Sequence, residues 1–167
     1  LIRFFTAALL VSLSGTVHAA ETTWQELTAR ADRFYHAGRY WDGTGPAHEA
    51  VKLAEESFGL DHPYVAQSLN RLALFQQAQG KYTEAESLFQ RSLEIQEKAL
   101  GPEHPDVALS LNNLAGLYRE QGTYEKVEPL YKRALEIWEK TFGAEHPKVA
   151  GSLNNLGEFY REQGKYS

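Results

Sequence analysis

The chain has 167 residues, a net charge of −5 and no cysteine. This length suits one modest domain. The lack of cysteine excludes a disulfide framework and a Cys-ligated zinc, and the negative charge argues against a nucleic-acid binder that works by neutralising phosphates.

The first twenty residues differ in composition from the rest. A short basic start, Leu1 to Arg3, precedes a largely apolar run over residues 4–13, and Val17 and Ala19 fit a small-residue cleavage pattern. This order predicts a signal peptide over residues 1–19, cleaved before Ala20. The alternatives are an uncleaved anchor and a buried first helix. Because the run is shorter than the roughly 20 residues that cross a bilayer, we expect no stable membrane span in the mature chain.

A Gly-x-x-His-Pro motif recurs along the remainder at one fixed step. Its histidines, His62, His104 and His146, are 42 residues apart each time, and residues 62–103 match residues 104–145 at 22 of 42 positions. A period of this size is typical of a solenoid built from stacked helical units. We therefore place units over about 22–61, 62–103 and 104–145, with an incomplete unit over 146–167, all in one domain spanning residues 20–167.

The first unit, about 22–61, departs from the others. Gly38 and Tyr40 match the inner turn of the later units, but the next stretch holds Gly43, Gly45 and Pro46. Two glycines and a proline should unwind this turn, so we expect the second helix to restart near Pro46. The segment is interpreted as part of an atypical terminal repeat or, alternatively, as a ligand-contacting loop.

Each complete unit reads as two antiparallel helices. In the third unit Pro105 is suited to the first helical position, apolar residues follow at helical spacing, and Gly122 supplies a left-handed C-cap. Tyr124 leads the second helix, which ends at Gly143.

The string Leu111-Asn-Asn-Leu-Ala-Gly-Leu-Tyr118, continued to Gly122 and Tyr124, resembles the tetratricopeptide repeat. The 42-residue period resembles the kinesin light chain subclass of that family. The resemblance implies an all-α, right-handed superhelical solenoid of antiparallel helix pairs, about three and a half repeats long, with the first helix of each pair lining a concave groove.

The fourth unit, 146–167, provides only a first helix. Because repeat arrays need a terminal cap to cover the last apolar face, we expect the chain to be a fragment of a longer array. Self-association through the uncapped C-terminal helix is the alternative.

The recurrent histidines suggest metal binding, but one per repeat places them about 10 Å apart. Zinc needs its histidine nitrogens at about 2.0–2.1 Å, so we expect them to cap helices and predict no metal site. The sequence also lacks nucleophile and phosphate-binding motifs, so we predict no catalytic residues, no cofactor and no enzyme activity.

The resemblance places a set of amides and arginines on the concave groove. An asparagine can pair with both the N–H and the C=O of a peptide, and arginine pairs with carboxylates, which favours an extended, acidic peptide as ligand. In the alternative, the asparagines bond between neighbouring helices and Arg119 pairs with Glu120 or Glu162. The predicted groove residues are Asn70, Arg71, Asn112, Asn113, Arg119, Asn154, Asn155 and Arg161.

Taken together, these observations predict an exported scaffold, periplasmic or secreted, that binds a protein or peptide partner and no nucleic acid. Two alternatives stay open. The chain is a self-assembly module, or it is an accessory region of a larger exported enzyme or secretion complex.

Overall fold

The computed structural model describes residues 2–164 of the chain, with side chains from residue 16 onward. The side chains of most of the predicted signal peptide and the last three residues of the fourth unit therefore lie outside the described part. Within it the fold is all-α, and its seven α-helices are α1 (Ile2–His36), α2 (Tyr40–Phe58), α3 (Pro63–Ala78), α4 (Tyr82–Leu100), α5 (Pro105–Gln121), α6 (Val127–Phe142) and α7 (Pro147–Glu162).

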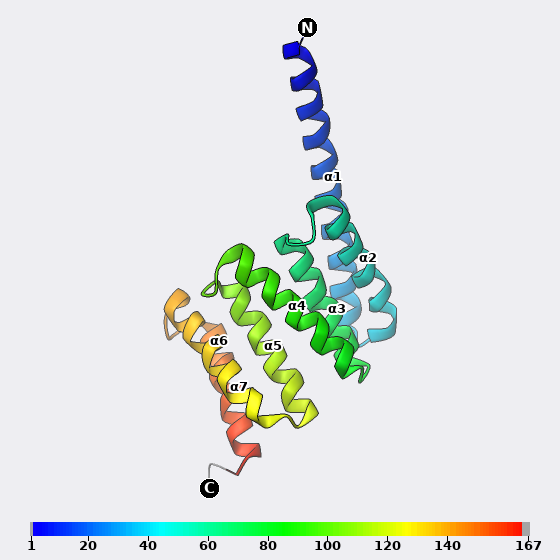
Figure 1. The fold of residues 1–167 in the computed structure, drawn as a ribbon. Helices are drawn as coiled ribbons and strands as arrows, with labels where there is room; N and C mark the ends of the chain where they lie inside the picture. The colour runs from blue at the N-terminus through cyan, green and yellow to red at the C-terminus, as the bar shows by residue number, and fades with distance from the viewer. Residues whose placement is uncertain (1, 165–167) are drawn as a thin grey trace.

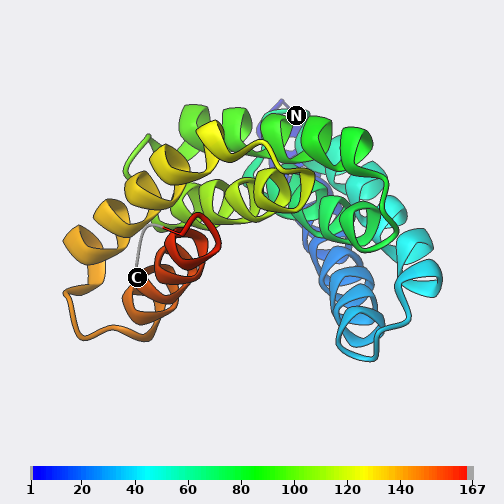
Figure 2. The same cartoon turned by 90° about the horizontal axis from the view of Figure 1, so that it is seen from below.

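These helices form a curved stack of antiparallel pairs, which confirms the predicted solenoid of three and a half repeats. The pairs are α1–α2, α3–α4 and α5–α6, and α7 follows alone (Figure 1). Seen along the other axis, the stack is an arch whose inner side carries α1, α3, α5 and α7 (Figure 2). The second helix of each pair lies on the outer side. The N-terminal part of α1 projects away from the body of the arch (Figure 1).

The Gly-x-x-His-Pro motif forms the outer turn between successive pairs. Gly59 and Gly101 end α2 and α4 with φ near +90°, which glycine adopts without steric cost. The Nδ1 atom of His62 then accepts a hydrogen bond from the backbone N–H of Tyr64 at 3.2 Å, and His104 and His146 repeat this bond at the same distance. The three histidines are therefore N-caps, as expected.

The second helix of the first unit does not restart near Pro46, and that prediction is wrong. Helix α2 is continuous from Tyr40 and contains Pro46. Packing explains the difference, because a Cβ atom on Gly43 would lie 2.3 Å from the ring of Phe75. The glycine lets the backbone of α2 approach that ring. Gln79 secures the same turn by donating hydrogen bonds to the carbonyl of Tyr40 and the hydroxyl of Thr44.

The third unit shows a smaller difference. Its second helix starts with a 3₁₀ turn over Tyr124–Lys126, and the α-helix begins only at Val127. Pro129 accounts for this, since it lacks the N–H that would bond to the carbonyl of Glu125 in a helix starting at Tyr124.

Ion pairs repeat along the outer side at the step of the solenoid. Arg91 on α4 contacts Glu55 on α2 at 2.7 Å, and the equivalent Arg133 on α6 contacts Glu97 on α4 at 2.6 Å. Both pairs are partly exposed, so each contributes about 1 kcal/mol or less. Their periodic placement ties each outer helix to the next one.

Candidate functional site: the concave groove

The groove lies on the inner side of the arch, where α1, α3 and α5 meet. It encloses a volume of about 490 Å³. Apolar side chains, including Tyr35, Leu74 and the 40% exposed Leu109, share its lining with polar groups such as Gln67 and Asn113. Exposed apolar surface with a few polar groups is the usual composition of a ligand site.

The predicted asparagines bond to one another across the repeats. Asn70 is only 6% exposed. Its Nδ2 donates to the hydroxyl of Ser110 at 3.1 Å, and its Oδ1 accepts from Asn113 at 2.9 Å. One repeat further on, Asn155 donates to Asn112 at 2.9 Å. These are the interhelical bonds of the alternative interpretation. They occupy both the NH₂ group and the oxygen of Asn70, and one polar atom each of Asn112, Asn113 and Asn155.

The remaining predicted asparagine, Asn154, lies on the exposed face of α7. Its Nδ2 is 3.4 Å from Oε1 of Glu158, a long contact within one helix. A separate recess on this face is lined by Leu153, Asn154, Gly157, Glu158 and Arg161. The predicted residues of α7 therefore do not share the α1–α3–α5 cavity.

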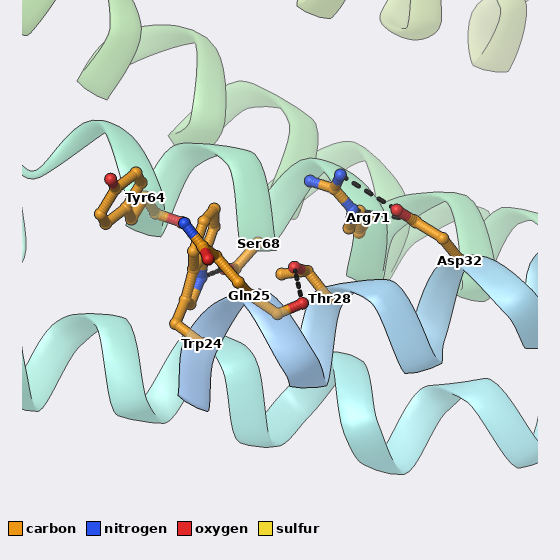
Figure 3. Close-up of polar contacts among 7 residues, drawn as sticks. All are labelled: Trp24, Gln25, Thr28, Asp32, Tyr64, Ser68 and Arg71. Carbon is orange, nitrogen blue, oxygen red and sulfur yellow. Dashed lines mark hydrogen bonds and ion pairs between the residues drawn. The ribbon is translucent and has the colours of Figure 1, made fainter. Parts of the chain in front are cut away.

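Two of the three predicted arginines are held by carboxylates of neighbouring repeats. Arg71 on α3 donates two hydrogen bonds to Asp32 on α1, at 2.9 and 3.2 Å (Figure 3). Arg119 on α5 contacts Glu158 on α7 at 3.3 Å. Its partner is thus neither Glu120 nor Glu162. Arg161 has no ion pair within residues 16–164.

Carboxylates on the inner side are less completely paired than the arginines. Glu120 is exposed at the end of α5 and has no ion pair within the described side chains. Asp106 lies 3.9 Å from Nδ1 of His104, which carries charge only when protonated. Together with Asp32, these carboxylates outnumber Arg71 around the α1–α3–α5 cavity, which the sequence pattern of arginines did not suggest.

A smaller recess of about 320 Å³ adjoins the main cavity near the inner turns. Tyr35, Tyr40, Leu74, Gln77, Ala78 and Glu120 line it. The rings of Tyr35 and Tyr40 meet edge to face with centroids 5.4 Å apart. Burial raises the pKa of Tyr35, and the nearby Tyr40 and Glu120 add to that rise, so its hydroxyl is a neutral donor at physiological pH.

Helix α1 also contributes to the groove, which the resemblance did not indicate. Asp32, Tyr35 and His36 all line the cavity. Tyr35 lies one 42-residue step before Gln77 of α3, but the first unit matches the repeat too weakly for the resemblance to extend the groove to α1.

Helix α1 is fixed to α3 at the start of the repeat domain. The indole N–H of Trp24 donates to the hydroxyl of Ser68 at 2.7 Å, and its ring stacks on Tyr64 with centroids 4.1 Å apart (Figure 3). The phenol of Tyr64 also donates to the carboxylate of Glu21 at 2.5 Å. Side chains from Thr16 to Ala19 are exposed, whereas Ala20 and Glu21 are partly buried.

No group of three or more potential ligands is arranged to hold a metal ion within the residues that the structure describes. Over the same residues, no helix is long and apolar enough to cross a membrane.

Comparison with known proteins gives one matching family, the tetratricopeptide repeat, over residues 64–140 and 110–167. No curated protein matches the chain. Among solved structures, BtubC (BKLC) from P. vanneervenii superimposes with a TM-score of 0.75 at 24% identity, covering 92% of this chain and 65% of its own. A protein from Podosopora anserina, described as a kinesin light chain with nearly identical TPR-like repeats, gives 0.76 at 27% identity, covering 84% and 66%.

The apo form of RapI also superimposes, with a TM-score of 0.69 at 22% identity, over 90% of this chain and 39% of its own. The chain thus spans less than two thirds of the length of each of these structures. Proteins of this repeat family are generally non-catalytic scaffolds, and the fold suggests protein partners. The chain belongs to the tetratricopeptide repeat family, in its kinesin light chain-like subclass.

Proposed function

We propose that the chain is a non-enzymatic scaffold that binds an extended segment of a partner protein in the α1–α3–α5 groove. The observation that carries the proposal is the cavity of about 490 Å³ on the inner side. Three repeats contribute to it, so a segment lying along the arch contacts all three at once. Leu109 and Tyr35 offer apolar contact, while Gln67 and Asn113 offer hydrogen bonds.

We do not propose the acidic ligand that the arginine pattern favoured. Arg71 and Arg119 already pair with Asp32 and Glu158. A bound carboxylate would have to displace these partners, and the freed Asp32 or Glu158 would then oppose it.

Peptide selection tests the proposed groove. A library of random peptides is selected on the full chain, and the enriched peptides are measured by fluorescence anisotropy on two variants. Leu109→Arg places a long charged side chain in the cavity, whereas Leu60→Arg makes the same change at a 61% exposed leucine on an outer turn. The proposal expects Leu109→Arg to abolish binding and Leu60→Arg to preserve it. Equal effects of the two variants would contradict it.

The proposal includes export to the periplasm or the extracellular space after removal of residues 1–19. The composition of those residues supports it, as does the exposure of the side chains of residues 16–19. Expression in a bacterial host, followed by fractionation and N-terminal sequencing, should find a periplasmic chain that starts at Ala20. Ala19→Arg should block the processing, and an unprocessed wild-type chain in the cytoplasm would contradict export.

A further inference from the structure

The small recess beside the groove combines the groups that recognise a cation. Two tyrosine rings form one side of it, and Glu120 and Gln77 come from the ends of α5 and α3. The negative face of an aromatic ring attracts ammonium and guanidinium groups within about 6 Å of its centroid. Residues of three successive repeats thus line one space of about 320 Å³.

Within residues 16–164, the side-chain oxygens of Gln77 and Glu120 are not used by the fold. Oε1 of Gln77 is buried and has no hydrogen-bond partner within the described residues. An amide oxygen can only accept hydrogen bonds, and a buried acceptor that is left without a donor costs about 1–3 kcal/mol. Glu120 likewise has no ion pair among the described side chains. In the described part of the chain, the buried oxygen of Gln77 lacks a donor and the exposed carboxylate of Glu120 lacks a cationic partner, and a lysine or arginine side chain supplies both donors and charge.

The neighbouring cations cannot meet this requirement in the observed arrangement. Arg71 is bound to Asp32 through two hydrogen bonds. Arg119, which precedes Glu120 in the chain, contacts Glu158 on α7 instead. Lys81, just beyond the end of α3, lies over the ring of Trp41 with its Nζ 5.0 Å from the centroid.

From this geometry we infer that the recess between Tyr35, Tyr40, Gln77 and Glu120 binds a lysine or arginine side chain of the segment held in the groove. The inference rests on the proposed function, because the recess adjoins the α1–α3–α5 cavity and shares Tyr35 and Leu74 with it. It gives the ligand a positive charge, whereas the arginine pattern suggested a negative one.

Two designed peptides of equal length test the inference. One alternates lysine with alanine over twelve residues, and the other alternates glutamate with alanine. Fluorescence anisotropy with the full chain should give binding of the lysine peptide and not of the glutamate peptide. Glu120→Gln should lower the affinity for the lysine peptide about five- to tenfold. This is the range expected for the loss of one ion pair or cation–π contact that is exposed or partly buried. Tyr35→Leu should weaken it by a similar factor.

The matched control is Glu136→Gln, which removes the same charge from an exposed position on α6 that does not line the recess. It should leave the affinity unchanged. Equal weakening by Glu136→Gln and Glu120→Gln would overturn the inference, because it would show only long-range attraction. If the two peptides bound with equal affinity, and Leu109→Arg lost that binding while Glu120→Gln kept it, the cation site would be wrong and the proposed groove would stand. Binding of neither peptide, or binding unaffected by Leu109→Arg, would count against both.

Discussion

The two ends of the solenoid present opposite surfaces. On α3, α5 and α7, the face toward the preceding repeat is apolar; Leu72, Leu114 and Leu156 occupy one of its positions and are buried. The equivalent residue of α1 is Arg30, and it is exposed. At the other end, α7 exposes the face that α3 and α5 bury against their outer helices. Leu153 is 51% exposed there, whereas its equivalent Leu111 is 1% exposed.

This difference contrasts a polar outward face on the first repeat with an apolar outward face on α7. The first repeat keeps the turns of the later repeats. On its outward face, however, polar residues replace the apolar ones, namely Thr23, Glu26, Arg30 and Arg33. At the C-terminal face the apolar pattern is retained in Ala150, Leu153 and Gly157 without a helix over it. A polar outward face needs no further helix to cover it, whereas an apolar one does.

The largest expected effect on stability comes from truncating equivalent leucines, one buried between repeats and one on the exposed face of α7. Leu111→Ala should lower the free energy of unfolding by about 2–5 kcal/mol, because a cavity forms in a filled core. Leu153→Ala should cost about 1 kcal/mol or less, since half of the side chain is already in water. Urea denaturation followed by circular dichroism measures both. A similar large loss in both variants would show that the α7 face is covered in solution and that the two ends do not differ.

A second pair of variants tests how the N-terminal repeat joins the array. Gly43→Ala places a Cβ atom 2.3 Å from the ring of Phe75 and should destabilise the fold by about 1–3 kcal/mol through overpacking. Gly45→Ala, two residues later in the same helix, meets open space and should raise stability by up to about 1 kcal/mol through helix propensity. Thermal melts of the two single variants suffice. If both were stabilising, the close approach of α2 to Phe75 would be wrong.

These pairs also show how far the sequence alone could go. The fixed step of 42 residues and the motif around His62, His104 and His146 were enough to predict the helix pairs, the turns and the N-caps. Local propensity failed at Pro46, because it takes no account of the tertiary contact between Gly43 and Phe75.

The groove was harder to predict than the fold. The resemblance to the repeat family placed Asn70 and Arg71 on the inner side, but it could not tell whether their polar atoms were already used. Their partners, Ser110 and Asp32, lie 40 and 39 residues away in the sequence and become neighbours only when the repeats stack. The recess beside Tyr35 was missed for the same reason, since it needs the ends of α1, α3 and α5 together.

A smaller effect is expected from the histidine caps. His104→Ala removes the acceptor for the N–H of Asp106 and should cost about 1 kcal/mol, whereas His104→Asn keeps an acceptor and should cost less. His146→Ala should act more locally, because α7 is covered on one side only. Hydrogen exchange should then show faster opening of α7 amides with little change in the inner helices. Uniformly faster exchange along the chain would mean that α7 unfolds together with the inner repeats.

The smallest effect on stability, and the sharpest test of the comparison, comes from rewriting the polar N-terminal face in the pattern of the inner repeats. Arg30→Leu combined with Arg33→Phe reproduces the residues found at the equivalent positions of α3. Both arginines are exposed and have no ion pair within residues 16–164, so the monomer should change by about 0.5 kcal/mol or less. The double variant should nevertheless associate, because it places new apolar side chains on an outer surface.

Light scattering over a concentration series should show a rising mass for the double variant. The control, Arg30→Gln with Arg33→Gln, removes the charges without adding apolar surface and should show a constant mass. If the apolar variant stayed monomeric, the arginines would not be what keeps this end of the array in solution. If the wild type already showed a rising mass that Leu153→Lys abolished, the exposed face of α7 would be a self-association surface, and the contrast would be between a polar face and a paired one.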